Sequence, residues 1–463
     1  MFKKIFAPTD MTSGSVWKSI VSFTVPMLIG NIAQQLYSTV DTIVVGKFAE
    51  NGDNAIAAVG SALPILNMLL VLFIGISAGA SVMAAQYFGA GNRKALSHTV
   101  GNCITVTAIA SVALMTIAAT PLLKIVLDLL RTPESISEDC WAYLTISLVG
   151  IAGMAYYNIL SGVIRGLGDS VSALLYLLVA TVLNIGLDLL FVAHPAFKMG
   201  VAGVALATVI SQFVSSALCM LKLARMKKHF DFGVKYMKPR SEYVKTIVKL
   251  GLPSGLTQAI FSSAMIIVQS LTNSFGEQFI AANVVIMRVD GFAMMPNFSF
   301  GTALTTFAGQ NVGANKMDRV EKGAKQGTLI AVGCSAFITA IILLFGKNLM
   351  GFFTDTRSLV DMSYRLMLIL AFGYIAVAVT QSLSGIMRGA GDTVTPMWIS
   401  LISTVAIRVP LAYGIAYLTR SSANGFKGMC ESIQISLLVS WVLGAVITFI
   451  VYRMGKWKGK QLS

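Results

Sequence analysis

The sequence predicts an all-α polytopic membrane protein, with twelve transmembrane helices in two pseudo-symmetric six-helix bundles. Three observations predict this fold class. The chain is unusually apolar, apolar runs of membrane-spanning length recur along it, and motifs of its first half return in its second half.

The composition is that of a chain embedded in a lipid bilayer. Of 463 residues, 56% are hydrophobic and only 12% are charged, whereas soluble domains carry about 25% charged residues. A helix needs about 20 apolar residues to cross the hydrocarbon core. Runs such as Val171 to Ala193 and Leu329 to Phe345 reach that length with their flanks.

Apolar runs separated by polar, Gly or Pro breaks give the predicted helices in order. In the first half they cover residues 19–45, 54–82, 97–119, 139–162, 172–193 and 201–222. In the second half they cover residues 246–272, 280–308, 324–348, 359–387, 395–418 and 430–453.

An internal repeat relates the two halves. Leu160 to Ser170 reads LSGVIRGLGDS and Leu383 to Thr393 reads LSGIMRGAGDT, and Gln86 and Pro26 recur at nearly the same spacing as Gln310 and Pro253. Each half has an even number of helices, so the repeats are parallel, with an axis along the membrane normal. We expect an N-terminal lobe at 1–222, a basic cytoplasmic linker at 223–245 and a C-terminal lobe at 246–463, with a central cavity between the lobes.

The positive charges indicate orientation. Most Lys and Arg residues lie on the side that holds both termini, so both termini are expected in the cytoplasm and the chain in the cell (inner) membrane. The N-terminus has no apolar core before Pro8, so we expect no cleavable signal peptide. The net charge of +15 lies largely in loops, and we read the linker as a solvated loop near anionic lipid, with no nucleic-acid partner.

Signatures of enzymes and cofactor sites are missing from the sequence. The five cysteines are scattered without CxxC spacing, and there is no phosphate loop and no HExxH motif. We expect a protein that is not an enzyme and carries no cofactor.

Buried polar residues are the best functional candidates, because a charge in the bilayer centre costs several kcal/mol. Asn184 and Asp188 lie one helical turn apart on one face. Asp41 and Thr208 are expected at a similar depth on helices 1 and 6. Together the four offer oxygen ligands for a proton or for Na⁺, and two nearby carboxylates in a low dielectric bind a proton readily. In the alternative interpretation Asp41 is interfacial and Asn184 ties helices together.

The repeat offers an internal control for this cluster. At the positions that correspond to Asp41, Asn184 and Asp188, the second half has Val268, Ile407 and Leu411. The candidate cation site is therefore expected in the first half only.

Other candidates are weaker. Arg288, Asp290 and Arg408 are buried charges of the second half, which either form ion pairs between helices or line a substrate cavity. Pro26 removes a backbone hydrogen bond from helix 1 and is a candidate hinge. Further polar, aromatic and Met candidates for lining the substrate path are Gln34, Gln35, Tyr37, Gln258, Gln269, Met287, Met294 and Met295.

Several motifs resemble the multidrug and toxic compound extrusion (MATE) family over essentially the whole chain. They are Gln34-Gln35-Leu36-Tyr37 with Asp41 and Gly46, AlaAlaValGly at 57–60, the loops Arg165 to Ser170 and Arg388 to Thr393, and Gln310-Asn311 with Gly313-Ala314. The resemblance implies export of organic cations or drugs in exchange for H⁺ or Na⁺, by rocking of two lobes.

The resemblance also implies a cation site. The sequence is similar to the bacterial type with an N-lobe Asp/Asn/Asp site, which Asp41, Asn184 and Asp188 match, and Thr208 matches a helix 6 Thr. Other members place acids on helices 7 and 10. Here the residues around Phe261 and from Val377 to Gln381 are apolar or neutral, so no such site is expected in the C-terminal lobe.

Three functions follow as hypotheses. The first is a monomeric cation-coupled multidrug antiporter with small organic, cationic substrates and the lipid bilayer as its partners. The second is a lipid or polysaccharide-precursor flippase, which the few basic residues within helices disfavour. The third is a receptor or structural protein without transport, which the duplicated halves disfavour.

Overall fold

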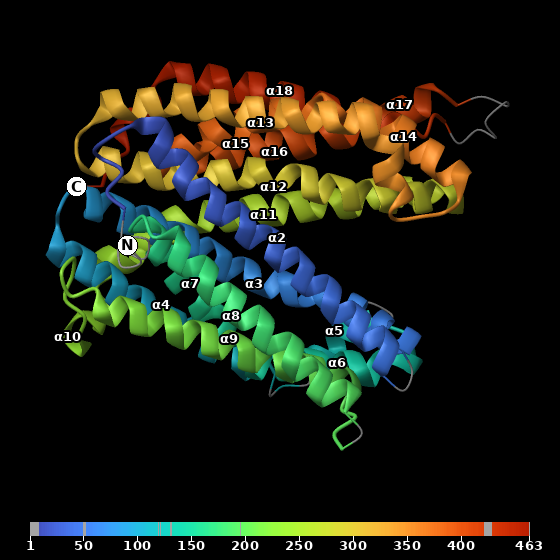
Figure 1. The fold of residues 1–463 in the computed structure, drawn as a ribbon, viewed down its shortest axis with the longest axis horizontal. Coiled ribbons are helices and arrows are strands. Elements are labelled where there is room, and N and C mark those ends of the chain that lie inside the picture. Colours follow the sequence, from blue (N-terminus) through green and yellow to red (C-terminus); the bar gives the residue numbers. More distant parts are fainter. Residues whose placement is uncertain are drawn as a thin grey trace. The chain divides into compact units, whose positions relative to one another are not determined.

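The computed structural model describes residues 9–49, 52–118, 120, 122–129, 132–194, 196–420 and 428–462. Over these residues the regular elements are helices, without a strand. The chain forms two compact units (Figure 1). Unit 1 contains Ile29–Gly255, and unit 2 contains Met11–Leu28 and Leu256–Ser463.

Two long helices, α2 (Val16–Phe48) and α11 (Ser241–Ser274), contribute to both units. The other elements of unit 1 are α3 (Gly52–Gly89), α4 (Arg93–Ala118), α5 (Leu122–Leu129), α6 (Glu134–Val149), α7 (Ile151–Gly166), α8 (Ser170–Asp188), the π-helix η1 (Leu189–Ala193), α9 (Gly200–Arg225) and the short α10 (Val234–Met237).

Unit 2 has a similar order of helices, without a counterpart of α5 among its described residues. Its elements are α12 (Glu277–Gly313), α13 (Met317–Gly351), α14 (Arg357–Ala371), α15 (Gly373–Gly389), α16 (Val394–Leu401), the π-helix η2 (Ile402–Ile407), α17 (Arg408–Leu418), α18 (Ser432–Met454) and the 3₁₀ turn η4 (Lys456–Gly459).

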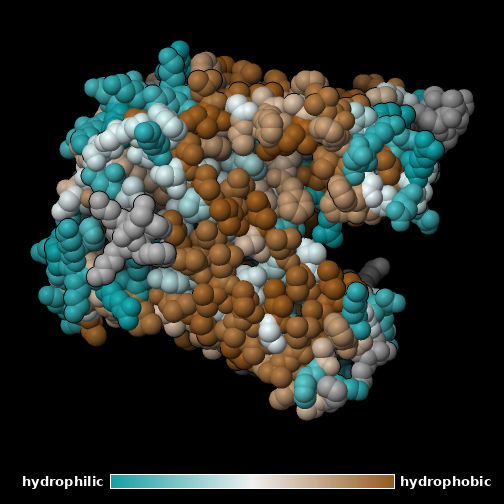
Figure 2. All heavy atoms as spheres, in the orientation of Figure 1, coloured by the Kyte–Doolittle hydropathy of each residue, from teal (hydrophilic) through white to brown (hydrophobic). Residues whose placement is uncertain are grey.

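The predicted fold class is confirmed. Ten described helices are long and apolar enough to cross a membrane, and the number rises to twelve when each of two bent helix pairs counts as one span. On the face drawn in Figure 2, hydrophobic residues cover the middle of the helices and hydrophilic residues gather at their ends. Such an apolar surface suits contact with lipid, where the helices satisfy their own backbone hydrogen bonds.

The two bends were not predicted. The pair α6 and α7 bends by 52° and the pair α14 and α15 by 45°, inside the predicted helices 139–162 and 359–387. A glycine lies at each break. A Cβ on Gly150 would come within 2.3 Å of Val209 Cγ1, and one on Gly373 within 2.4 Å of Trp441 Cε3. The glycines therefore allow a close approach of the neighbouring helix at the bend.

The units divide at other points than the predicted lobes, near Pro26 in α2 and Pro253 in α11. In unit 2 the start of the chain is held by side chains: Gln310 Oε1 accepts from the Met11 N–H at 2.9 Å, and Arg319 donates to the carbonyls of Met11, Ser13 and Gly14.

In unit 1 the first half of α11 packs on α3 through glycines. A Cβ on Gly79 would lie 2.5 Å from the Ile247 carbonyl oxygen, and one on Gly251 would lie 2.5 Å from the Gly75 carbonyl oxygen. The first halves of α2 and α11 are thus each packed in the unit formed mainly by the opposite half of the chain.

The repeated loops start α8 and α16 in the same way. Asp169 accepts from the Ser172 N–H and hydroxyl at 2.9 and 2.7 Å, and Asp392 accepts from those of Thr395 at 3.2 and 2.7 Å. Such side-chain caps stabilise a helix start. Among the described residues, the first copy alone adds an ion pair, in which Lys222 Nζ lies 2.9 Å from Asp169 Oδ2.

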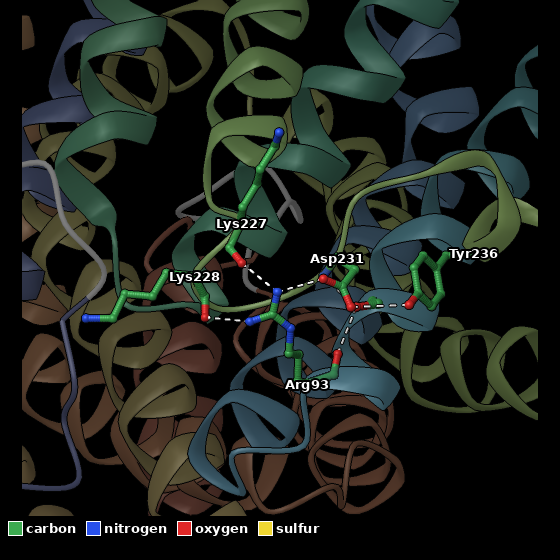
Figure 3. Close-up of polar contacts among 6 residues, drawn as sticks. Arg93, Lys227, Lys228, Asp231 and Tyr236 are labelled. Atoms are coloured by element: carbon green, nitrogen blue, oxygen red, sulfur yellow. Dashed lines mark hydrogen bonds and ion pairs between the residues drawn. The ribbon is translucent and has the colours of Figure 1, made fainter.

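The basic linker is packed on unit 1 (Figure 3). Arg93, at the start of α4, donates to the carbonyls of Lys227 and Lys228 at 2.7 and 3.0 Å and to Asp231 Oδ1 at 2.6 Å. The Asp231 N–H donates to Ser97 Oγ at 2.8 Å. The stretch read from the sequence as a solvated loop therefore has an anchored path across α4.

Removing the Arg93 guanidinium is expected to release this path. In Arg93→Gln, limited trypsin digestion after Lys227 and Lys228 should split the chain severalfold faster than in the wild type, because three charge-assisted hydrogen bonds are lost. Lys94→Gln removes an exposed neighbouring charge and trypsin site and should leave the rate unchanged. Equal rates in the two variants would show that Arg93 does not hold the linker.

The contact between Arg93 and Asp231 also predicts how the stability of the linker depends on pH. The hydrogen bond from Arg93 lowers the pKa of Asp231 below its usual value. A carboxyl with a lowered folded-state pKa stabilises the fold above its unfolded pKa of about 3.9, and this stabilisation is lost as the pH falls through the folded pKa. Hydrogen exchange of the linker, corrected for intrinsic rates, should therefore rise only in that acid range, and a rise near neutral pH would contradict the assignment.

Candidate functional site

The four cation-site candidates meet inside unit 1. In the orientation of the Asn184 amide that satisfies both of its ends, its nitrogen donates to Asp41 Oδ1 at 2.9 Å and to Asp188 Oδ2 at 3.1 Å. Its oxygen accepts from the Thr208 N–H at 3.2 Å. The amide therefore bridges two carboxyl groups from α2 and α8 and fixes them against α9.

The cluster is shielded from solvent. Asn184 and Asp188 are fully buried, Thr208 is 8% exposed, and Asp41 is half-buried. Asn184 and Asp188 share a face of α8 because they lie one turn apart. The π-helix η1 begins directly after Asp188, and such π segments are frequent at functional sites.

Tyr37 belongs to this cluster as well. Its hydroxyl lies 3.0 Å from Thr208 Oγ1, at hydrogen-bond distance. The sequence marked Tyr37 only as a substrate-lining candidate, although its place one turn before Asp41 on α2 was a usable signal. Tyr143 of α6, which is 5% exposed, also interacts electrostatically with both carboxyls. Nothing in the sequence singled it out.

The arrangement can hold one cation. The carboxyls of Asp41 and Asp188 both accept from the Asn184 amide nitrogen, so a proton bound by one carboxyl would also be stabilised by the other. Asp188 Oδ1 is buried and has no hydrogen-bond partner among the residues that the structure describes. A free buried carboxylate oxygen beside amide and hydroxyl oxygens also suits a hard cation.

Unit 2 contains a cavity of about 410 Å³ in place of such a cluster. Five of the predicted substrate-lining residues border it: Gln258, Gln269, Met287, Asp290 and Met294. Its walls also include Val268, the counterpart of Asp41, so the acid of the first repeat is replaced here by an apolar side chain.

Three polar residues of the lining stand out, namely Asp290, Arg408 and Gln434. Tyr374 Oη donates to Asp290 Oδ1 at 2.9 Å. Arg408 follows the π-helix η2, and its Nε is buried without a hydrogen-bond partner in the described part of the chain. Gln434 is 1% exposed, and its amide donates to Asn283 Oδ1 at 3.3 Å. Tyr374 and Gln434 were missed from the sequence, where their only signal was a polar group within an apolar helix.

The remaining candidates lie elsewhere. Gln34 and Arg288 are exposed, Gln35 is half-buried, and none of these three lines the cavity of unit 2. Pro26 lies inside the continuous helix α2, close to the point where the helix passes from unit 2 to unit 1. Met295 is buried.

Comparison with known proteins identifies relatives over the full length. The family model MatE matches residues 26–190 and 253–414. A Bacillus subtilis protein named "Probable multidrug resistance protein YoeA" is 31% identical, over 97% of this chain and 96% of its own length. A Thermotoga maritima protein named "Probable multidrug resistance protein NorM" is 26% identical, over 96% and 94% of the two chains.

A solved structure shares the fold. It is described as the outward-facing conformation of a multidrug resistance MATE family transporter of the MOP superfamily, and it superposes with a TM-score of 0.87 at 23% identity. The match covers 98% of each chain.

Proposed function

The chain belongs to the MatE family, and from that premise we propose that it is a secondary active exporter of drugs and other small organic, mainly cationic, compounds. Export proceeds in exchange for H⁺ or Na⁺ by alternating access. Relatives named as multidrug resistance proteins support the substrate class. One observation carries the coupling: a buried amide, Asn184, bridges the carboxyls of Asp41 and Asp188.

The coupling step follows from that geometry. A cation from outside, either a proton shared by the two carboxyls or Na⁺ held by their oxygens, neutralises charge that is costly to bury. Loss of the cation to the cytoplasm leaves two carboxylates close together, which favours a rearrangement that separates or rehydrates them. The cation gradient therefore drives a movement of α2, the helix that carries Asp41.

Pro26 is the proposed hinge in this rearrangement. It removes one backbone hydrogen bond within α2, and it lies two to three residues before the point at which α2 changes from unit 2 to unit 1. The protein acts as a monomer in the cell (inner) membrane, with both termini in the cytoplasm and with neither a cofactor nor a nucleic-acid partner.

Transport in reconstituted vesicles tests the proposal. Vesicles that contain the purified protein and ethidium are given an imposed H⁺ gradient or an imposed Na⁺ gradient. We expect dye efflux under one of them at a rate well above that of protein-free vesicles, and the effective gradient identifies the ion. Absence of efflux under both gradients, together with scrambling of a fluorescent lipid, would replace the proposal by the flippase alternative.

A further inference from the structure

The cavity of unit 2 contains two opposite charges that do not neutralise each other by direct contact. Asp290 and Arg408 both line it and interact electrostatically, yet no ion pair within 4 Å joins them among the described residues. The sequence left open whether they pair across helices or line a cavity. The structure favours the second reading.

The two charged side chains differ in their hydrogen bonds. Asp290 accepts a hydrogen bond from Tyr374, which is itself held because Asn297 Nδ2 donates to its carbonyl at 3.2 Å. Arg408 Nε, in contrast, is buried and has no hydrogen-bond partner within the described chain. An unpaired buried guanidinium donor is costly, so a ligand oxyanion that accepts from it would be bound strongly.

A second unpartnered group faces the same cavity. Gln434 is 1% exposed and lines the cavity, and its Oε1 has no hydrogen-bond partner in the part of the chain that is described. Its amide nitrogen donates to Asn283, another lining residue, at 3.3 Å. The free oxygen is a pure acceptor, and it therefore adds a place for an N–H donor of a ligand.

The local backbone also distinguishes this wall. Ser403 and Thr404 lie in the π-helix η2, and both line the cavity next to Arg408, the first residue of α17. π segments are rare and are frequent at functional sites. This segment and the residue after it contribute two hydroxyls and the guanidinium to the lining of the cavity.

Charge balance selects the ligand. With Asp290 and Arg408 both charged, the empty cavity is neutral, and a singly charged ligand would leave one unit of charge without compensation in a buried site. A ligand that has one positive and one negative group keeps the sum at zero and pairs with both residues. The volume of about 410 Å³ suits a drug-sized molecule, and Met287, Met294 and Trp441 supply an apolar wall.

We infer that this cavity binds compact amphipathic zwitterions, with the ligand's carboxylate on Arg408 and its cationic nitrogen toward Asp290 and Gln434. The inference rests on the proposed export function and adds a substrate class to it. Arginine suits the carboxylate because its planar fork presents parallel N–H donors.

A matched pair of dyes tests the inference. Rhodamine B is a zwitterion, and its ethyl ester has the same cationic ring system without the carboxylate. Binding of each dye to the purified full-length protein is measured by fluorescence polarisation, without any gradient. In Arg408→Gln we expect rhodamine B to bind at least about tenfold more weakly, while the affinity for the cationic ester does not fall, because Asp290 is then the uncompensated charge of the cavity.

Further variants distinguish a specific loss of ligand binding from a general loss of folding. Arg408→Lys keeps the positive charge but loses the planar guanidinium. It should weaken the binding of rhodamine B by a smaller factor than Arg408→Gln does, and it should leave the binding of the ester unchanged. Asp290→Asn should weaken both dyes. Arg365→Gln removes an arginine whose side chain is 64% exposed and pairs with Glu431, and it should change neither affinity.

The outcomes separate this inference from the proposed function. If Arg408→Gln weakens both dyes equally, or neither of them, recognition of a ligand carboxylate by Arg408 is wrong. Efflux of the ester driven by a gradient would then still support the exporter. If instead the wild type shows no efflux while the two dyes bind as expected, the inference about ligand binding in the cavity is supported and the proposed export function is wrong.

Discussion

Asp188→Asn is expected to reduce gradient-driven dye efflux to the level of protein-free vesicles. The substitution retains the volume and an acceptor for the Asn184 amide, which donates to Asp188 Oδ2 at 3.1 Å, so the fold should persist. It removes the group that shares a proton with Asp41 or that gives Na⁺ a charged ligand. Asp41→Asn should have the same effect, because the coupling cation is proposed to need the carboxyls of both Asp41 and Asp188.

The matched control is another acid of unit 1. Asp53 is exposed in the first turn of α3, so Asp53→Asn changes the net charge by the same amount away from the cluster and should transport like the wild type. Retention of efflux in the Asp41→Asn and Asp188→Asn double variant would remove the N-lobe cluster from the mechanism.

Asp169→Ala is expected to destabilise the protein by more than the loss of a helix cap alone. It removes the cap of α8, which is worth about 1 kcal/mol, and it breaks the ion pair with Lys222, whose side chain is only 15% exposed. Loss of one partner of a buried ion pair costs about 3 kcal/mol or more. Thermal unfolding in detergent, followed by size-exclusion chromatography, gives the measurement.

The second repeat supplies the control. Asp392 caps α16 with the same geometry, but α18, the counterpart of α9, has no Lys or Arg before Arg453. Asp392→Ala should therefore cost only the cap, about 1 kcal/mol. An equal loss of stability in the two variants would mean that the Lys222 ion pair contributes nothing.

The sequence was informative wherever a local pattern determines the structure. Apolar runs located the ten described spans and the two bent helix pairs with ends that are off by up to seven residues, because a bilayer imposes the length and composition of a helix. The repeat located the capped loops at Asp169 and Asp392. The grouping of Asp41, Asn184, Asp188 and Thr208, inferred from helix direction and depth, agrees with their contacts, while their role as a cation site stays a prediction.

Features that depend on packing between distant segments could not be read from one sequence. At Gly150 and Gly373, beside the bends, a neighbouring side chain occupies the space that a Cβ would need, and this contact joins segments far apart in the chain. The linker follows a defined path because Arg93 meets three groups more than a hundred residues away in the chain. The first half of α2 likewise belongs to unit 2 because Ile20 and Phe23 pack in a core cluster with Phe300 and Leu304 of α12.

The central claim is that cation coupling and substrate recognition are separate, with the coupling ion at Asp41 and Asp188 in unit 1 and the substrate in the cavity of unit 2. The most direct test measures the affinity for rhodamine B ethyl ester and the gradient-driven efflux of that dye in the same Asp41→Asn and Asp188→Asn double variant. The account predicts that efflux is lost while the dissociation constant stays within about threefold of the wild type, a difference below about 0.7 kcal/mol. Loss of dye binding together with efflux would contradict it, because the two carboxyls would then be the substrate's own site.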